Sequence, residues 1–328
     1  MLSQSLRLSV PAKINLHLRV GPRRDDGFHP LLTWMTTIGL FDSLLIAIQE
    51  SESSHAGHLP IDSPVAAEGS RGDRLNVQMT CSDASLPCDG RNLVVKAAQA
   101  FGKDESIGVL GNSVHRSSLL VRIHLEKRIP AGGGLGGGSS DAASTLLGLH
   151  HLTAGGDAKS EIPRLARIAE RLGSDVPFFL YGPSSICQGR GEAVLPIGAP
   201  SGMWVTLVLP PIGMPTADVY RKFDEMKLGR EEDVTRTPNW EQWKSLNAIS
   251  LLPNLVNDLE TPAFAIRPDL KELRQNIEQL VGRIVRMSGS GSSLFTLFDS
   301  QEEAEAAAKK IASRFEVKAH AVPLAPVS

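Results

Sequence analysis

A glycine-rich segment in the middle of the chain carries the clearest chemical signal in the sequence. Six of the seven positions from 132 to 138 are glycine, and Ser139, Ser140 and Asp141 follow them. Glycine lacks a Cβ, so successive backbone N–H groups can converge on one ligand in conformations that other residues avoid. A helix that starts directly after such a loop adds unpaired N–H groups and a partial positive charge. The segment therefore predicts a phosphate site, where the two serine hydroxyls can contact phosphate oxygens or a bound Mg²⁺.

Three other interpretations of this segment fit less well. A flexible linker is disfavoured because a strand-like run, Val121 to Leu125, precedes the loop and an alanine-rich, helix-like run follows it. A Walker A loop needs Gly-Lys-Ser/Thr, and this loop contains no lysine. A dinucleotide-binding fold needs an acidic residue ending a second strand about 20 residues further on, whereas Asp157 follows a predicted helix.

Several elements must position this loop from the N-terminal side. Residues 6–20 alternate in an extended pattern and predict two short strands, or one strand broken at Pro11. A second extended run covers residues 31–48. Residues 50–73 are polar and aperiodic, which predicts a surface insertion. Asn92 is able to cap a predicted helix over residues 92–101.

The chain after the loop predicts helices first and then a second group of strands. Ser140 or Asp141 is expected to cap the next helix, and a further helix is expected over 162–172, ended by Gly173. A Gly/Pro/Ser-rich stretch predicts a boundary between an N-terminal domain, 1–197, and a C-terminal domain, 198–328. In the second domain, WVTLVLP, RIVRMSG, SLFTLFD and VKAHAV read as strands, and Ser300 caps a predicted helix over 301–315. This order is typical of a two-layer sandwich, and the fold class is α+β.

Composition narrows the classes of function. The chain has 328 residues, 41% of them hydrophobic and 21% charged, which excludes a disordered or fibrous protein. The net charge of −2 argues against a broadly basic nucleic-acid-binding face, and no apolar run approaches the roughly 20 residues that span a bilayer. Three cysteines without metal-ligand spacing favour a reduced, cytoplasmic setting. No nucleic-acid partner and no membrane are therefore expected, and the sequence leaves the oligomeric state open.

Two further motifs share the chain with the glycine segment. Residues 11–16 read PAKINL and residues 287–295 read MSGSGSSLF. In this order, the three segments resemble the three motifs of the GHMP kinase superfamily. The resemblance implies a two-domain fold, with an N-terminal domain like ribosomal protein S5 domain 2 and a ferredoxin-like C-terminal domain.

The resemblance also implies ATP as phosphoryl donor, Mg²⁺ as cofactor and a set of binding residues. The ATP-binding positions that it implies are Pro130, Gly132, Gly133, Gly134, Leu135, Gly136, Gly137, Gly138, Ser139, Ser140 and, on the adenine side, Asn92. The loop that supports them is implied to include Ser288, Gly289 and Gly291. Either Ser139 or Ser140 coordinates the Mg²⁺ in this interpretation, and Ser140 is the candidate that we carry forward.

A finer similarity selects one branch of the superfamily. PAKINLHL followed by DGFHPL, the doubled GGG around Leu135, and GSDVPFF from Gly173 are similar to the 4-diphosphocytidyl-2-C-methyl-D-erythritol kinases of the non-mevalonate isoprenoid pathway. That branch implies a small-molecule substrate, CDP-methylerythritol, and ATP-dependent phosphorylation of its 2-hydroxyl. Asp175 is then the implied base, and Lys13 is the cation that keeps it ionised. Asn15 shares a strand face with Lys13, where it either orients the substrate or closes a backbone hydrogen bond.

The same branch implies the residues that bind the cytidine substrate. Phe28, at a position where the family usually has tyrosine, and Tyr220 would stack on the two faces of the cytosine ring. His29 would read the edge of the base, and Thr216 either contacts the erythritol hydroxyls or packs. Two alternatives remain open: another GHMP small-molecule kinase of the mevalonate or homoserine type, and a non-catalytic nucleotide-binding regulator on the same fold.

Overall fold

The computed structural model of the chain describes residues 4–50, 75–104, 119–154 and 158–326. The predicted insertion at 50–73 lies, beyond Glu50, outside the described residues. The chain divides into two compact units, each assembled from three segments. Unit 1 comprises Met1–Val10, Phe41–Arg128 and Gly138–Leu180, and unit 2 comprises Pro11–Leu40, Ile129–Gly137 and Tyr181–Ser328. The predicted boundary between residues 197 and 198 lies inside the last segment of unit 2 and stays a prediction.

Two long strands contribute to both units. β1 (Gln4–Val20) and β2 (Leu31–Glu50) pair with each other. The sequence left a break at Pro11 open, and the structure has one uninterrupted strand there. Within the sheet of the described residues β1 pairs only with β2. A proline, which lacks the N–H donor, is tolerated on a strand paired along one side.

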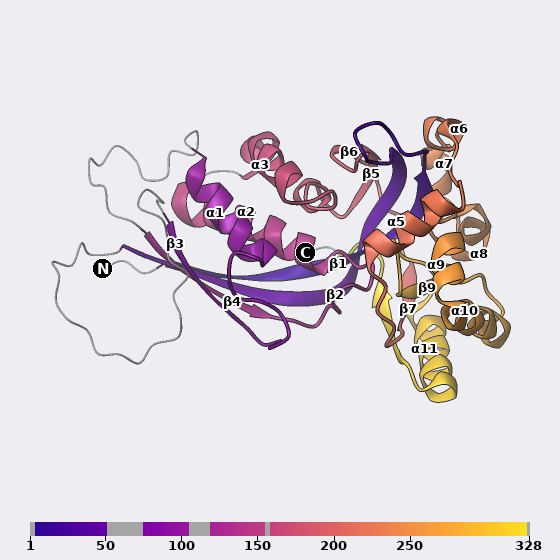
Figure 1. The fold of residues 1–328 in the computed structure, drawn as a ribbon. Helices are drawn as coiled ribbons and strands as arrows, with labels where there is room; N and C mark the ends of the chain where they lie inside the picture. The colour runs from indigo at the N-terminus through magenta and orange to yellow at the C-terminus, as the bar shows by residue number, and fades with distance from the viewer. Residues whose placement is uncertain (1–3, 51–74, 105–118, 155–157, 327–328) are drawn as a thin grey trace. The chain divides into compact units, whose positions relative to one another are not determined.

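In unit 1 the sheet continues from β2 through β4 (Leu119–Glu126) to β3 (Leu75–Cys81). β4 runs antiparallel to β2, with Ile46 opposite Ile123, and parallel to β3. Alternate residues of β4 are buried, the period of a strand with one covered face. Helices on one side of this sheet supply the cover (Figure 1): α1 (Leu93–Lys103), α2 (Gly137–Ala154) and α3 (Ala158–Leu172). The short α4 (Phe178–Tyr181) follows α3.

The start of α2 differs from the prediction. An N-cap at Ser140 or Asp141 is wrong, because the helix begins at Gly137 and both residues lie inside it. Gly136 ends the loop with a left-handed φ of 67°, and the backbone turns helical at the next residue. A glycine conformation therefore sets the start of the helix. The first N–H groups of an α-helix have no partner within it. In α2 these groups lie next to the glycine loop, because the helix begins directly after it.

Unit 2 contains the other strands. The first half of β2 pairs with β5 (Ser184–Gly189), which pairs with β6 (Ala193–Pro196). A second, antiparallel sheet has the order β10 (Lys318–Pro323), β7 (Trp204–Leu209), β9 (Leu294–Phe298) and β8 (Arg286–Met287). The four predicted strands are confirmed, although RIVRMSG is extended only at Arg286 and Met287.

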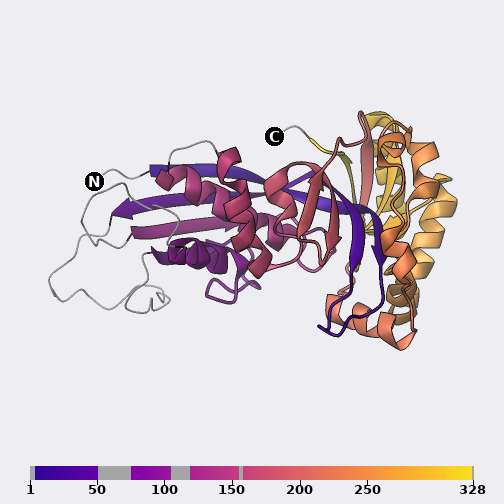
Figure 2. The ribbon, with the colours of Figure 1, turned by 90° about the horizontal axis from the view of Figure 1, so that it is seen from above.

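Helices cover one face of this second sheet (Figure 2): α9 (Glu260–Ile266), α10 (Pro268–Val281) and α11 (Gln301–Phe315). The predicted cap of α11 is confirmed, since the Ser300 hydroxyl accepts a hydrogen bond from the backbone N–H of Glu303 at 3.3 Å. The intervening segments are short helices: α5 (Thr216–Glu225), α6 (Glu231–Thr235), α7 (Trp240–Trp243), α8 (Ala248–Leu251) and the 3₁₀ turn η1 (Leu252–Asn254).

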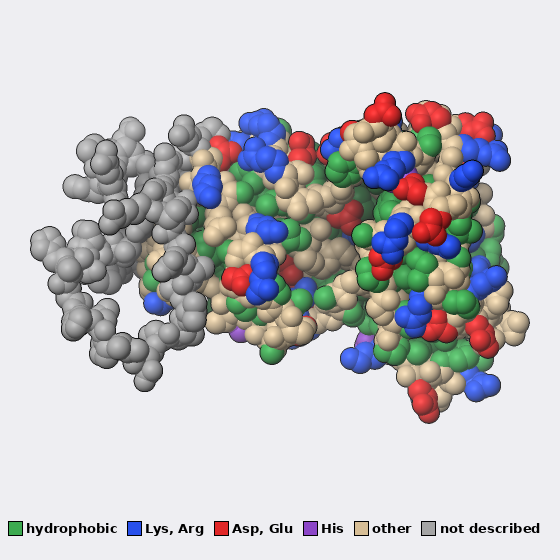
Figure 3. Space-filling model, viewed as in Figure 1, with side chains coloured by type: hydrophobic (Ala, Val, Ile, Leu, Met, Phe, Trp, Pro, Cys, Tyr) green, Lys and Arg blue, Asp and Glu red, His purple; other side chains and the backbone are tan. Residues whose placement is uncertain are grey.

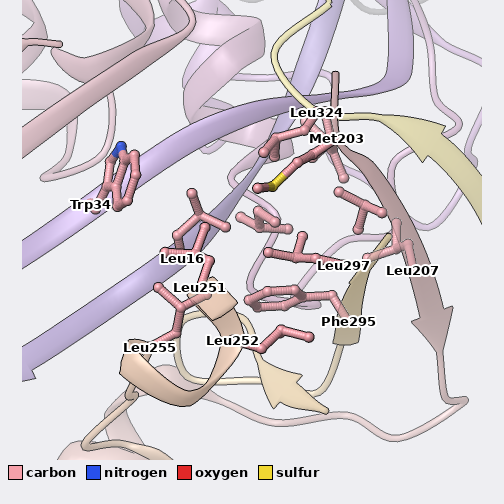
Figure 4. Close-up of a cluster of buried hydrophobic side chains, with 14 of the residues drawn as sticks. Leu16, Trp34, Met203, Leu207, Leu251, Leu252, Leu255, Phe295, Leu297 and Leu324 are labelled. Atoms are coloured by element: carbon pink, nitrogen blue, oxygen red, sulfur yellow. The ribbon is translucent and has the colours of Figure 1, made fainter. Parts of the chain in front are cut away.

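Alternate residues of β9 enter two different apolar clusters. Leu294 packs in the cluster that includes Ile277 and Ile311 of the covering helices. Phe295 and Leu297 point the other way, into a second cluster that also contains residues of β1, β2, α8 and η1. Figure 4 shows side chains from these distant segments converging there. The two-residue period of a strand thus gives both faces of the sheet a core.

A histidine is buried at the edge of the second cluster. His17, on β1, lies edge-on to Trp240 and Trp243 at ring distances of 5.6 and 5.3 Å. Burial lowers the pKa of His17 to about 3, and the nearby positive charge of Arg19 acts in the same direction. The imidazole is therefore neutral in the folded protein over the whole range in which a free histidine takes up a proton.

This burial predicts an acid sensitivity that a variant can isolate. The unfolded chain protonates His17 below about pH 6.5 and the folded chain does not, so stability falls as the pH drops from there towards 3. The substitution His17→Phe is expected to remove this loss in the free energy of unfolding, which is at most about 1.4 kcal/mol per pH unit. Urea unfolding at about pH 7 and about pH 5 measures it, and an identical pH dependence in both proteins would contradict the assignment.

Candidate functional site

Lys13 and Asn15 form the polar part of β1 in unit 2. Lys13 is only 3% exposed, and its Nζ donates to Asn15 Oδ1 at 2.5 Å, so the two side chains share a face as the strand period predicts. Asn15 Nδ2 donates to Thr33 Oγ1 on β2 at 2.9 Å, and that hydroxyl donates to the backbone oxygen of His17 at 2.7 Å. Ile14 and Leu16, which alternate with these polar residues along β1, are buried and apolar. This chain of hydrogen bonds fixes the orientation of the Asn15 amide beside the ammonium.

The glycine loop lies directly against this strand. The backbone N–H of Lys13 donates to the carbonyl of Leu135 at 2.9 Å. Gly132, Gly134 and Gly136 have φ values of 72°, 75° and 67°, a left-handed conformation that side chains disfavour. Left-handed residues alternating with others curl the backbone into a concavity whose N–H groups can bind an anion. The glycines that the sequence singled out therefore have the conformation that a phosphate cradle needs.

A second glycine loop, residues 288–293, supports the first. Ser288 Oγ donates to the carbonyl of Gly134 at 2.9 Å, and the N–H of Ser293 donates to the carbonyl of Gly133 at 3.2 Å. Ser288 Oγ also accepts from the N–H of Asn15 at 3.2 Å. In a trans peptide the carbonyl and the next N–H point in opposite directions. Because the support loop holds these carbonyls, the N–H groups of Gly134 and Leu135 are directed away from it.

Two buried residues that sequence reasoning missed hold the support loop in turn. Asn257 Nδ2 donates to the carbonyls of Met287 and Gly289 at 2.7 and 2.8 Å. Glu260 Oε1 accepts from the N–H of Met287 at 2.9 Å. Burial raises the pKa of Glu260, while that hydrogen bond and Arg286 act in the opposite direction. The available signal was an Asn-Asp-Leu-Glu run between apolar segments, but its partners lie about 30 residues away.

The predicted substrate residues also lie in unit 2. Thr216, at the start of α5, is within hydrogen-bond distance of Ser290 in the support loop, with 2.8 Å between the hydroxyls. His29 and Tyr220 have ring centroids 5.3 Å apart. Phe28 is 49% exposed, and the guanidinium of Arg190 lies 3.9 Å from the centre of its ring. The structure thus brings His29 and Tyr220 together, while Arg190, which the sequence analysis did not name, lies on Phe28.

Unit 1 holds the remaining predicted residues. Asn92 caps α1, accepting from the N–H of Val94 at 3.0 Å and donating to the carbonyl of Pro87 at 2.8 Å. Asp175 is half-buried in the turn between α3 and α4. Ser139 and Ser140 lie in α2, and the fully buried Ser140 Oγ has no hydrogen-bond partner among the described residues.

A buried charge cluster ties α2 to the sheet of unit 1. Lys127 Nζ donates to Asp42 Oδ2 at 2.5 Å and to Asp141 Oδ2 at 2.9 Å. Burial raises the pKa of Asp141 to about 7, with Asp42 adding repulsion and Lys127 opposing the shift. Burial alone would lower the pKa of Lys127, but the two carboxylates raise it. The lysine stays charged, and its bond to Asp141 connects the chain just before the glycine loop with the chain just after it.

Comparison with known proteins agrees with these motifs. The family descriptions "GHMP kinases N terminal domain" and "GHMP kinases C terminal" match residues 92–183 and 236–317. A curated 4-diphosphocytidyl-2-C-methyl-D-erythritol kinase of Brevibacillus brevis is 34% identical, over 90% of this chain and 89% of its own length. The chain belongs to the GHMP kinase family. A chloroplastic enzyme of the same name from Arabidopsis thaliana is 33% identical, over 88% of this chain and 66% of its own.

Solved structures place this GHMP kinase in the same fold. A crystal structure of 4-(cytidine 5'-diphospho)-2C-methyl-D-erythritol kinase has a TM-score of 0.68 and 33% identity, covering 98% of this chain and 100% of its own. A homoserine kinase of Cytophaga hutchinsonii has a TM-score of 0.64 at 18% identity, covering 98% and 95%, and shares the fold alone. The expected two-domain GHMP kinase fold, with mixed helices and sheets, is confirmed.

The surface of this GHMP kinase carries mixed charge where α5 is exposed. On α5, Asp218 pairs with Arg221 and Lys222 with Glu225, each at 3.0 Å. Acidic and basic side chains are interspersed over this part of the molecule (Figure 3). Every helix of the described segments is too short or too polar to traverse a bilayer.

Two glycine variants test the support of the cradle. A Cβ on Gly134 would lie 2.1 Å from the backbone oxygen of Ser288, whereas one on Gly132 would meet nothing within 4 Å. Both positions have left-handed φ, so Gly132→Ala is expected to cost about 1–2 kcal/mol of stability. Gly134→Ala has the same backbone strain and must also displace the backbone of Ser288. It is therefore expected to lose more stability and to raise KM for ATP. Urea unfolding and ATP kinetics measure both effects, and equal behaviour of the two variants argues against the clash.

Proposed function

We propose that this chain transfers the γ-phosphoryl group of ATP to the 2-hydroxyl of 4-diphosphocytidyl-2-C-methyl-D-erythritol. One observation carries the phosphoryl-transfer part: a glycine cradle, braced by a second loop, is hydrogen-bonded to the strand that carries buried Lys13. The substrate part rests on the relatives of that name and on the aromatic residues beside α5. The proposed domain boundary at 197/198 falls between the two matched family segments.

The proposed chemistry needs positioning and charge more than covalent participation by the protein. The 2-hydroxyl oxygen forms a bond to the γ-phosphorus, the bond from that phosphorus to the β–γ bridging oxygen breaks, and ADP leaves. We assign the hydroxyl proton to the carboxylate of Asp175. We assign Lys13 to the charge of the transferring group, because a buried ammonium acts strongly on charge that develops nearby.

Mg²⁺ fits this site through one observed group. The buried Ser140 hydroxyl, unpartnered among the described residues, is an oxygen ligand of the kind that Mg²⁺ accepts, with phosphate oxygens and water completing the shell. Bound Mg²⁺ would neutralise phosphate charge. Asn92 would help to form the part of unit 1 that contacts ATP. Its side-chain amide already fixes the start of α1 through hydrogen bonds to the backbone of Val94 and Pro87.

The substrate side draws on residues of one unit. Phe28 and Tyr220 would stack on the cytosine, for which an aromatic face is sufficient, so phenylalanine serves in place of tyrosine. Thr216 would contact the erythritol hydroxyls from the start of α5, where Ser290 orients its hydroxyl. Asn15 would orient the reacting end of the substrate beside Lys13.

A panel of alcohols tests the function. ATP consumption by the purified protein is expected with CDP-methylerythritol, and at least about 100-fold less with mevalonate, homoserine or methylerythritol phosphate, because these lack the base that the aromatic residues stack on. Phosphorus NMR of the product locates the new phosphate. Equal turnover of mevalonate and the CDP substrate would contradict the substrate assignment, and binding of ATP without turnover of any alcohol would favour the regulator alternative.

A carboxamide at position 175 tests the base. Asp175→Asn is expected to lower kcat by about 100-fold or more, since loss of a positioned base typically costs that much, while the Kd for ATP changes little. Glu170→Gln, on the exposed surface of α3, is the matched control and keeps full activity. Unchanged kcat in the Asp175 variant refutes its assignment as base.

A further inference from the structure

The turn between β1 and β2 is held from two sides. Its backbone closes through Gly21, whose N–H donates to the carbonyl of Pro30 at 2.8 Å, and Arg24, whose N–H donates to the carbonyl of Phe28 at 2.8 Å. The turn carries Phe28 and His29, which the proposed function places at the base. The phenyl ring of Phe28 is half exposed.

Both ring nitrogens of His29 face oxygens of the protein. Nδ1 donates to the carbonyl of Gly21 at 2.9 Å, and Nε2 lies 3.2 Å from Oδ1 of Asp224. The side chain of His29 is 7% exposed and packs against Tyr220 and, edge-on, against Phe223 at 5.5 Å. Both ring nitrogens therefore lie against oxygens of the protein, one on each side of the ring.

Asp224 links this turn to the helix that carries the other stacking residue. Tyr220 and Asp224 are four residues apart on α5 and therefore share a face of the helix. The second oxygen of Asp224 lies 3.6 Å from Nη1 of Arg23, so one carboxylate contacts the turn at two side chains. The carboxylate thus contacts His29 and Arg23, both of which belong to the turn.

Phe28 is held separately on the same turn. Asp26 accepts from the N–H of Phe28 at 3.0 Å and pairs with Arg190 at 2.7 Å. These contacts lower the pKa of Asp26, the backbone hydrogen bond being the larger cause and Arg190 the next. Arg190 stacks on the Phe28 ring, a favourable cation–π arrangement. The ring is oriented by the protein before any ligand arrives.

We propose that Asp224 is a positioning residue for the cytidine moiety: by holding His29 and Arg23 it fixes the turn that carries Phe28 relative to α5, which carries Tyr220. The inference rests on the proposed function, and it adds a contact between His29 Nε2 and α5 that braces the turn. A spacing between two aromatic residues that is set in advance lowers the cost of ordering them around the base.

The test uses the full chain and CDP as the probe, with binding measured by calorimetry. Asp224→Asn removes the charge that pairs with His29 and Arg23 while keeping the shape, and is expected to weaken CDP binding and raise KM for CDP-methylerythritol about tenfold. KM for ATP and kcat stay unchanged, which a general loss of structure would not allow. Glu225→Gln is the matched control, because its partner Lys222 lies on the same helix and not on the turn.

A second pair of variants keeps the proposal testable if Asp224→Asn folds poorly. His29→Gln is expected to weaken CDP binding to a similar extent, and the double variant to be no worse than either single one, because the two residues act as a unit. Additive losses, or CDP affinity that is unchanged in either single variant, overturn the proposal. Absence of CDP binding by the unsubstituted protein overturns it as well.

The two ideas fail in different ways. Weaker CDP binding by Asp224→Asn without any phosphorylation of CDP-methylerythritol by the unsubstituted protein refutes the proposed function and leaves the positioning role standing. Full turnover of CDP-methylerythritol with Asp224→Asn indistinguishable from the unsubstituted protein refutes the positioning role and leaves the function standing.

Discussion

The hydroxyl group of Ser288 is the junction on which the phosphate cradle depends. It donates to the carbonyl of Gly134 and accepts from the N–H of Asn15, so one atom connects both glycine loops and β1. Asn257 in turn binds the carbonyls of Met287 and Gly289, and Glu260 binds the N–H of Met287. The loop is therefore held by hydrogen bonds within the protein, and in the proposed function its N–H groups would need little reorganisation when charge develops on a phosphate.

Both units hold charged groups in their interiors. In unit 1, Lys127 is matched by two carboxylates, one of which has a pKa near neutrality, a costly arrangement that tolerates loss of neither partner. In unit 2, the ammonium of Lys13 donates to the amide oxygen of Asn15, and Glu260 pairs with Arg286 at 3.5 Å. A nucleotide site built on backbone N–H groups and a few such cations, as proposed, is compatible with a net charge of −2.

Much of the cradle could be predicted from sequence because a cluster of glycines indicates a backbone conformation that other residues avoid. Gly132, Gly134 and Gly136 have the left-handed φ that favours a residue without a Cβ. The shared face of Lys13 and Asn15 followed from the strand period. The start of α2 was misplaced because Gly136, and not a side-chain cap, initiates it. Asn257, Asp224 and Arg190 were missed because their partners are remote in sequence, Arg190 and Asp26 being 164 positions apart, and no local pattern records such pairings.

The division of each unit into three segments constrains how the protein comes to be folded. The core of unit 2 joins Leu16 and Trp34, from the first strands, with Phe295 and Leu324, near the other end of the chain. A nascent chain emerges from its N-terminus, so the cluster around β1 stays incomplete until almost the whole polypeptide has left the ribosome. Contacts of such long sequence separation are formed slowly. The strand that carries Lys13 acquires its final environment among the last events of synthesis, and a chain that stops short of β9 lacks Phe295 and Leu297 in the cluster around that strand.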